Sequence, residues 1–129
     1  MTPLKKTGEF ISGRFFSSIK YKANKRNIPF DLTIEFCDEL LIDQSHKCAY
    51  TGLPIDAKTR YATTASLDRI DSSLGYTEDN VQFLHKDINF MKWELSEDKF
   101  FTLISRIYEK RIYEEVARQL ETEAQSKAI

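Results

Sequence analysis

The sequence contains little cysteine, proline or glycine and no long apolar segment. Its 129 residues include 4 Gly, 3 Pro and 2 Cys, which excludes collagen-like proteins and disulfide scaffolds. Unbroken apolar runs reach only two or three residues, and none follows the first lysines, so we predict neither a membrane span nor a signal peptide. Cys37 and Cys48 show no C-x-x-C spacing. These absences favour one globular, cytoplasmic domain.

Charge is unevenly distributed, although the net charge is only −1. Residues 1–30 contain seven basic residues and one acidic residue, a net charge of +6, whereas the other 99 contain 12 basic and 19 acidic residues, a net charge of −7. A short basic run is often only the solvated face of a helix. The alternative, which stays open here, is a surface for a polyanion such as nucleic acid.

The first 45 residues are predicted to be mainly helical. Residues 9–26 show helical periodicity, and Pro29 favours an extended connector over 27–32. Thr33 can cap a second helix over 34–44. The first helix has an apolar face and a separate cationic face, which are formed by Phe16, Ile19 and Ala23 and by Arg14, Lys22 and Lys25.

Turn and strand patterns begin at residue 46, and two helices follow them. We predict a short strand at 47–50, a turn at 51–55, a hairpin with strands at 66–70 and 80–84, a short helix at 85–93, and a long helix capped by Ser96 and ending near Glu121.

Apolar residues in the long helix recur every four positions, at Ile104, Tyr108, Ile112, Val116 and Leu120. Such a row drifts by about 40° per step around a helix of 3.6 residues per turn. A partner with one flat surface cannot cover this apolar row, so the helix must bend, be interrupted, or wrap around its partner. A second subunit is one partner that would cover it, which makes a homodimer through this helix a hypothesis.

Polar residues in and after the hairpin suggest a metal site. Asp68 lies near the end of the first strand, Asn80 begins the second, and Asn89 lies on the next helix. A hairpin followed at once by a helix can bring Asp68 and Asn89 to one hard cation, because both supply oxygen ligands. Taken singly, such residues are common in turns and caps.

The order and spacing of these residues resemble the HNH, or ββα-metal, endonucleases. Counted from Asn80, His85, Asn89 and Lys92 lie at offsets of five, nine and twelve, as in that family. The segments IPFDLT, CAYTGLPI, SLDRIDSSLGYT and NVQ are similar to those of small phage-type HNH proteins. The resemblance implies an α+β fold with a ββα-metal core at 46–95, between a basic helical region at 1–45 and a C-terminal helix at 96–129, within a single domain.

The resemblance also implies roles for individual residues in metal-dependent cleavage of DNA. Asp68 and Asn89 would bind Mg²⁺ or Mn²⁺, and Asn80 would be structural. The cytoplasm of a bacterial or phage-infected cell is the expected location. DNA contacts would come from basic side chains at Arg14, Lys22, Lys25, Arg26 and Lys92.

The structural zinc site of the family needs two C-x-x-C pairs, and this chain departs from that pattern. At the first pair of positions this chain has Cys48 and Thr51, and at the second pair it has His85 and Ile88. Two of four ligands cannot hold zinc tetrahedrally. We therefore expect no structural zinc, and we expect Cys48 to be a small buried side chain packed near His85.

The general base of the family is the histidine of an Asp-His pair, and Arg69 occupies that position. Arginine stays protonated and cannot accept a proton from water, although it can bind a phosphate oxygen. The base is therefore another group, a water activated by the metal, or absent. His85 is the best side-chain candidate, although it could equally fill a vacated zinc-ligand position. Asp71 is a weaker candidate.

Three functions remain open at this stage. The leading hypothesis is a metal-dependent DNA endonuclease with Asp68, Arg69, His85 and Asn89 in its catalytic site. The second is an HNH-fold nucleic-acid-binding module that cannot cleave, because Arg69 replaces the base. The third is an interaction protein that forms a coiled dimer through its last helix.

Overall fold

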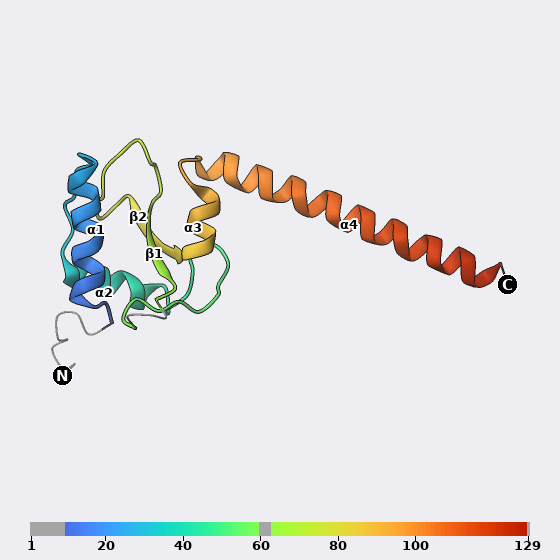
Figure 1. The fold of residues 1–129 in the computed structure, drawn as a ribbon, viewed down its shortest axis with the longest axis horizontal. Helices are drawn as coiled ribbons and strands as arrows, with labels where there is room; N and C mark the ends of the chain where they lie inside the picture. The colour runs from blue at the N-terminus through green and yellow to red at the C-terminus, as the bar shows by residue number, and fades with distance from the viewer. Residues whose placement is uncertain (1–9, 60–62, 129) are drawn as a thin grey trace. The chain divides into compact units, whose positions relative to one another are not determined.

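The computed structural model describes residues 10–59 and 63–128, and the chain divides into two compact units. The predicted α+β class, with a hairpin followed at once by a helix, is confirmed (Figure 1). The unit Met1–Glu94 contains α1 (Gly13–Lys25), α2 (Ile34–Asp43), β1 (Ala65–Arg69), β2 (Val81–His85) and α3 (Lys86–Lys92), and the unit Leu95–Ile129 contains α4 (Glu97–Lys127).

Side-chain caps determine where three helices begin. Ser12 Oγ accepts a hydrogen bond from the Phe15 N–H at 3.0 Å, and α1 starts after it. Glu9, where the helix was predicted to start, lies outside the described residues. The predicted caps Thr33 and Ser96 are confirmed, because each side-chain oxygen accepts an N–H three residues later. α4 continues beyond the predicted end to Lys127, since residues 121–127 contain no glycine or proline to stop it.

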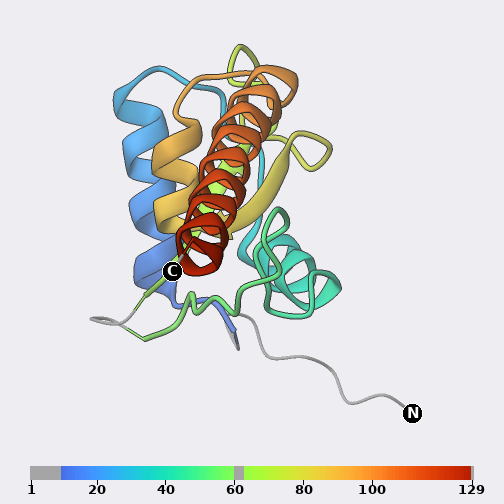
Figure 2. The same cartoon turned by 90° about the vertical axis from the view of Figure 1, so that its right-hand side faces the viewer.

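The hairpin is buried on both faces. β1 and β2 pair antiparallel, with Asp68 opposite Gln82, and each lies within one residue of its predicted range. Phe83 and Leu84 are adjacent in β2 and point to opposite faces, yet both are 0% exposed. Figure 2 shows α1, α2 and α3 around the hairpin. α3 contacts Ser66 and Asp68 on one face, and Phe15 of α1 lies against Phe83 on the other. Helices therefore cover both faces of a two-stranded sheet that would be only marginally stable alone.

The strand predicted at 47–50 is wrong. Only an isolated bridge joins Lys47 to Pro54, and the Cys48 N–H donates to the Leu53 carbonyl at 2.8 Å. The chain turns back at once through Gly52, whose φ of +72° suits glycine. The result is a tight turn that places Cys48 in the core, where it is 2% exposed.

Asn80 closes the hairpin loop with its side chain. Its Oδ1 accepts the Asp71 N–H at 2.9 Å, and its Nδ2 donates to the carbonyls of Asp71 at 3.0 Å and Gly75 at 2.9 Å. The residue is 6% exposed. Three hydrogen bonds from one buried amide hold the two ends of the loop at a set distance, which agrees with the structural role that the resemblance implies.

The loop also packs against the connector between α1 and α2. The Tyr76 N–H donates to the Pro29 carbonyl at 2.8 Å, and the Asp31 N–H donates to the Tyr76 carbonyl at 2.9 Å. A Cβ at Gly75 would lie 2.7 Å from the Pro29 carbonyl oxygen, so only glycine permits this approach. This contact places the Tyr76 ring beside Arg69, with the guanidinium carbon 5.4 Å from the ring centroid.

Candidate metal and nucleic-acid site

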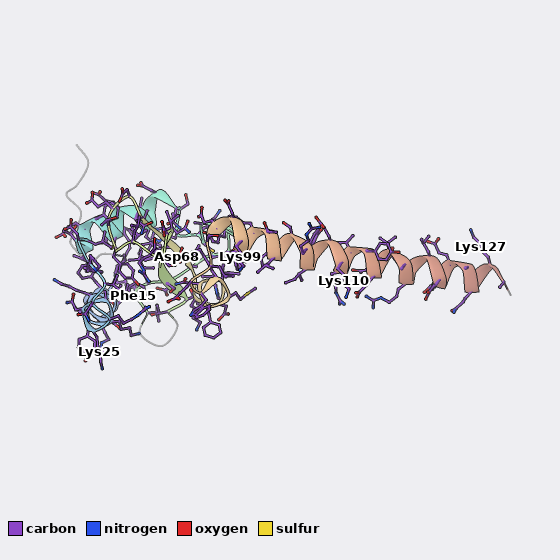
Figure 3. All side chains as sticks on the ribbon, turned by 90° about the horizontal axis from the view of Figure 1, so that it is seen from above. Phe15, Lys25, Asp68, Lys99, Lys110 and Lys127 are labelled. Atoms are coloured by element: carbon purple, nitrogen blue, oxygen red, sulfur yellow. The ribbon has the colours of Figure 1, made fainter. Side chains whose placement is uncertain are left out.

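Asp68 is a buried carboxylate at the centre of the candidate site. It is 4% exposed, and Figure 3 labels it within the body of the first unit. Its Oδ1 lies 3.1 Å from Lys92 Nζ, and its Oδ2 accepts from Gln82 Nε2 at 3.0 Å. Gln82 is in turn oriented by Tyr50, whose Oη lies 2.7 Å from the same nitrogen. The strand partner and the following helix therefore fix the orientation of the carboxylate.

Asn89 lies on α3 and borders the same cavity as Asp68, whose volume is about 450 Å³. The Asn89 Nδ2 donates to Ser66 Oγ at 2.6 Å. This bond uses the amide nitrogen and leaves the amide oxygen as the atom that a cation would bind. The structure thus brings together the two residues predicted to bind metal.

The donor set fits a hard divalent cation. Carboxylate and amide oxygens are ligands of Mg²⁺ and Mn²⁺, and Mg²⁺ usually takes one or two protein ligands and completes its shell with water and phosphate. Among the described residues, no group of three or more His, Cys, Asp or Glu side chains could hold a metal ion. Asp68 and Asn89 would therefore leave most coordination positions open to solvent and substrate.

Lys92 differs from its predicted role as a DNA contact. Its side chain is 0% exposed, and its Nζ donates to Asp68 Oδ1 at 3.1 Å and to the Arg69 carbonyl at 3.2 Å. A buried ammonium of this kind is not available to DNA in this conformation. Position 92 lies on the side of α3 that faces β1, which the sequence spacing alone did not show.

Arg69 lines the cavity, and its guanidinium also bonds to the hairpin loop. The Nη1 donates to the carbonyls of Ser72 at 2.7 Å and Leu74 at 2.9 Å. Asp71, a weaker base candidate, has its pKa lowered by hydrogen bonds from the Ser73 hydroxyl and N–H and by the charges of Arg69 and Lys92. A lower pKa makes Asp71 a poorer proton acceptor.

The structure does not place His85 among the residues that line the cavity. His85 is the N-cap of α3, and its Nδ1 accepts the Asp87 N–H at 3.2 Å. Its backbone N–H also bonds to the Cys48 thiol. This position corresponds to the second interpretation of His85, in which it fills a vacated zinc-ligand position.

Hydrogen bonds surround the Cys48 sulfur. Burial raises the pKa of the Cys48 thiol, but bonds from the Thr51 hydroxyl and from the backbone N–H groups of His85, Thr51 and Tyr50 outweigh it, so the pKa is lowered. The predicted proximity of buried Cys48 to His85 is therefore confirmed. Thr51 contributes a hydroxyl where the family has a thiolate, and the absence of structural zinc stays a prediction.

Basic side chains line both the cavity and a hollow beside it. This second hollow, of about 440 Å³, borders the cavity and shares Arg26, Ser66, Lys86 and Asn89 with it. Basic side chains along the two hollows come from three elements or their ends, and they are Arg14, Lys22, Arg26, Arg69 and Lys86. Among the described residues that line them, the acidic side chains are those of Asp68 and Glu94. We call these two hollows the basic groove.

Lys25 does not line the basic groove, although the sequence analysis grouped it with the DNA contacts. Figure 3 shows it on α1 pointing away from the hairpin, whereas Phe15 points toward the hairpin. Its Nζ lies 5.9 Å from the centroid of the Tyr21 ring. Among the predicted contacts, Arg14, Lys22 and Arg26 are the ones that face the groove.

Three lining residues on α3 and its cap were not predicted from the sequence. Lys86, Phe90 and Trp93 border the cavity together with Asn89. Their spacing of i, i+3, i+4 and i+7 is that of one helical face. This spacing defines one face of a helix, but it does not show whether that face borders a cavity or the core.

Comparisons with known proteins support this geometry at the level of the fold. No protein-family model matches the sequence, and no curated protein matches it. Among solved structures, the rare-cutting HNH restriction endonuclease PacI is similar, with a TM-score of 0.55 and 18% identity over 85% of this chain and 92% of that chain. The chain has an HNH-like fold. Its hairpin and α3 are the elements that carry Asp68 and Asn89. In the part of the chain that the structure describes, no helix is long and apolar enough to span a membrane.

Proposed function

We propose that this HNH-like protein is a metal-dependent DNA endonuclease that hydrolyses phosphodiester bonds. The observation that carries the proposal is that Asp68 and Asn89 line one cavity, which forms part of the basic groove. A DNA backbone held by the cations of the groove would bring a phosphate to two oxygen ligands. The fold shared with PacI adds support, because that protein is an HNH restriction endonuclease.

Each residue of the site has a definable task in this proposal. Mg²⁺ or Mn²⁺ bound by Asp68 and Asn89 would offset charge on the leaving 3′ oxygen and acidify a water molecule. Lys92 and Gln82 hold the Asp68 carboxylate in position. Ser66 Oγ accepts a hydrogen bond from the Asn89 amide N–H, and the Asn89 amide oxygen therefore points away from Ser66. Arg69 can offset the charge of the phosphate.

A nucleic-acid-binding module without cleavage is the second candidate function, and one specific observation favours it. Arg69 stands where the family has its base, and no histidine among the described residues lines the cavity. A binding module would keep the basic groove and lose the proton acceptor. The two functions therefore differ in chemistry but share the same DNA contacts.

Supercoiled plasmid incubated with the full-length protein and Mg²⁺ or Mn²⁺ separates the two functions. We expect nicked or linear product that EDTA prevents, because chelation removes the cation that Asp68 and Asn89 are proposed to bind.

The Arg69→Ala variant should cleave plasmid much more slowly than the wild type. The Arg69→Lys variant should recover only part of the cleavage rate, because an ammonium lacks the planar two-point fork of a guanidinium. Gel retardation without cleavage, together with new cleavage by Arg69→His, would support the binding module instead.

DNA affinity should depend on the groove and not on the total charge of α1. We expect Arg26→Ala to lower the slope of log affinity against log salt by about one, because each lost phosphate contact removes about one released counterion. Lys25→Ala is the matched control, since it removes the same charge from the neighbouring residue outside the groove. Equal slopes for the two variants would contradict the assignment of the groove. Fluorescence anisotropy of a labelled duplex measures the slope.

The exposed apolar row of α4 supports a homodimer, which we propose as part of this function. Ile112, Val116 and Leu120 are 41%, 47% and 61% exposed, and the unit Leu95–Ile129 contains no other element to cover them. Rows spaced by four residues pack against each other when two helices cross at about 50°. A second copy of α4 presents the same row and therefore fits this spacing.

Charge favours an antiparallel arrangement of the two α4 helices. Residues 99–111 carry four basic residues and one acidic residue, a net charge of +3, whereas residues 112–123 carry one basic and four acidic residues, a net charge of −3. An antiparallel partner places each half against the opposite charge.

Sedimentation velocity of charge-reversed variants tests the dimer. We expect the wild type to be dimeric, and we expect Lys110→Glu/Arg111→Glu and Glu114→Lys/Glu115→Lys each to be monomeric. An equimolar mixture of the two variants should recover the dimer, because it restores opposite charges across the interface. A monomeric wild type at tens of micromolar would contradict the proposal.

A further inference from the structure

Two large aromatic side chains at the candidate site are exposed to solvent. Phe90 is 86% exposed and Trp93 is 73% exposed, and both line the cavity that contains Asp68 and Asn89. The opposite side of α3 packs into the core through Ile88 and Lys92. Phe90 and Trp93 therefore contribute little apolar burial to the fold, and their position at the cavity calls for a ligand with an apolar surface.

The backbone at Trp93 is held in an uncommon conformation. Its φ of +50° lies in the left-handed region, which a bulky side chain rarely adopts. The Trp93 N–H donates to the Asn89 carbonyl at 3.0 Å, Ser72 Oγ donates to the Glu94 carbonyl at 3.1 Å, and Arg26 lies 3.6 Å from the Glu94 carboxylate. Contacts from the hairpin loop and the end of α1 thus keep the indole at the cavity mouth.

Cations surround these two rings. Arg26, Arg69 and Lys86 line the same cavity as Phe90 and Trp93. A ligand that is complementary to this surface carries both negative charge and flat aromatic faces. A nucleotide strand has both, because each phosphate is followed by a base.

We propose that Phe90 and Trp93 stack on an unpaired nucleobase beside the phosphate that occupies the cavity. This inference rests on the proposed function, because it names the form of DNA that the same site prefers. A base inside an intact duplex already stacks on its neighbours, so its face is not accessible to a side chain. The site therefore selects DNA with a locally unpaired nucleotide over a perfect duplex, and it does so with little dependence on sequence.

Trp93 is the only tryptophan of the chain, so its fluorescence reports the proposed contact directly. Full-length wild-type protein in EDTA, which prevents cleavage, is titrated with three labelled DNAs of equal length. They are a perfect duplex, the same duplex with one bulged thymine, and the same duplex with an abasic residue in place of that thymine. We expect the bulged duplex to quench Trp93 and to bind about 5- to 100-fold more tightly than the perfect duplex. The abasic duplex should lose most of both effects.

Variants separate stacking from general binding. Trp93→Ala and Phe90→Ala should each weaken binding to the bulged duplex by about 5- to 100-fold, and Trp93→Phe should retain most of it, because a phenyl ring still stacks. Tyr21→Ala is the matched control, because Tyr21 is 65% exposed and lies outside the cavity. Circular dichroism melts confirm that each variant folds.

Two results would overturn the inference, and they are distinguishable. Salt-sensitive binding with unchanged Trp93 fluorescence and equal affinity for the bulged and perfect duplexes would exclude stacking and leave the basic groove intact. Failure to bind any of the three DNAs would contradict the proposed function itself, and stacking with it.

Discussion

Asp68→Asn is expected to slow DNA cleavage at least about a thousand-fold at a temperature where circular dichroism shows the variant to be folded. The carboxylate is the only charged oxygen ligand among the described residues proposed to bind the metal, and a bound cation contributes several kcal/mol to stabilising the transition state. Asparagine removes the counter-charge of the buried Lys92 ammonium, which lies 3.1 Å from Asp68 Oδ1, and this lowers stability, but it keeps an oxygen acceptor for that ammonium. Alanine would remove that acceptor and confound loss of activity with loss of stability.

The measurement is the single-turnover cleavage rate at saturating Mg²⁺, paired with calorimetric titration of Mn²⁺ into each protein. Asn89→Ala should also lose both cleavage and Mn²⁺ affinity, whereas Asn89→Asp keeps an oxygen ligand and should retain metal binding. The matched control is Gln44→Ala, because Gln44 hydrogen-bonds to Phe83 in the same hairpin but lies outside the cavity. Cleavage by Asp68→Asn at the wild-type rate would remove Asp68 from the metal site.

Lys92→Met is expected to lower the free energy of unfolding by about 3–5 kcal/mol, which is the usual cost of breaking a buried ion pair. Both partners are buried, with Lys92 0% and Asp68 4% exposed. Without the ammonium, the Asp68 carboxylate would stay in the core with an uncompensated charge. Urea unfolding followed by circular dichroism measures the loss. Lys86→Met, an exposed lysine on the same helix, is the control and should change stability little.

The same variant tests whether Lys92 and a metal ion act on one carboxylate. If both do, added Mg²⁺ should raise the melting temperature of Lys92→Met more than that of the wild type, because a bound cation replaces the missing positive charge. The double variant Asp68→Asn/Lys92→Met should lose less stability than the sum of the two single variants. Equal Mg²⁺ effects on wild type and Lys92→Met would show that metal binding is independent of this pair.

The helices and strands of both units were largely predictable because their signals are local. Thr33 and Ser96 cap helices through bonds to residues three positions later, and sequence reasoning finds such bonds readily. The strand predicted at 47–50 failed because its pattern of four residues is too short to exclude a turn. The hydrogen bond from the Cys48 N–H to the Leu53 carbonyl shows that the segment is a turn.

Two residues of the candidate site, both proposed to bind metal, were predicted from the sequence, and fewer of the residues around them were. Asp68 and Asn89 were found from their order along the chain, and the structure places both on one cavity. For His85 the sequence left two interpretations open, and the structure does not place it among the residues that line the cavity. Phe90 and Trp93 were missed because exposed aromatic residues carry no signal until their surroundings are known.

By itself, the sequence determined the order of the elements, the cationic face of the first helix and the residues able to bind a hard cation, since these follow from local periodicity and side-chain chemistry. Only the tertiary structure decided which cations face the groove. Arg26 and Lys25 are adjacent and carry the same charge, yet Arg26 lines the groove and Lys25 does not. The tertiary structure also decided that Lys92 is buried against Asp68 and does not face the groove. The physical reason is that exposure and pairing depend on contacts between segments far apart in the chain, and these contacts form only when the hairpin packs between its helices.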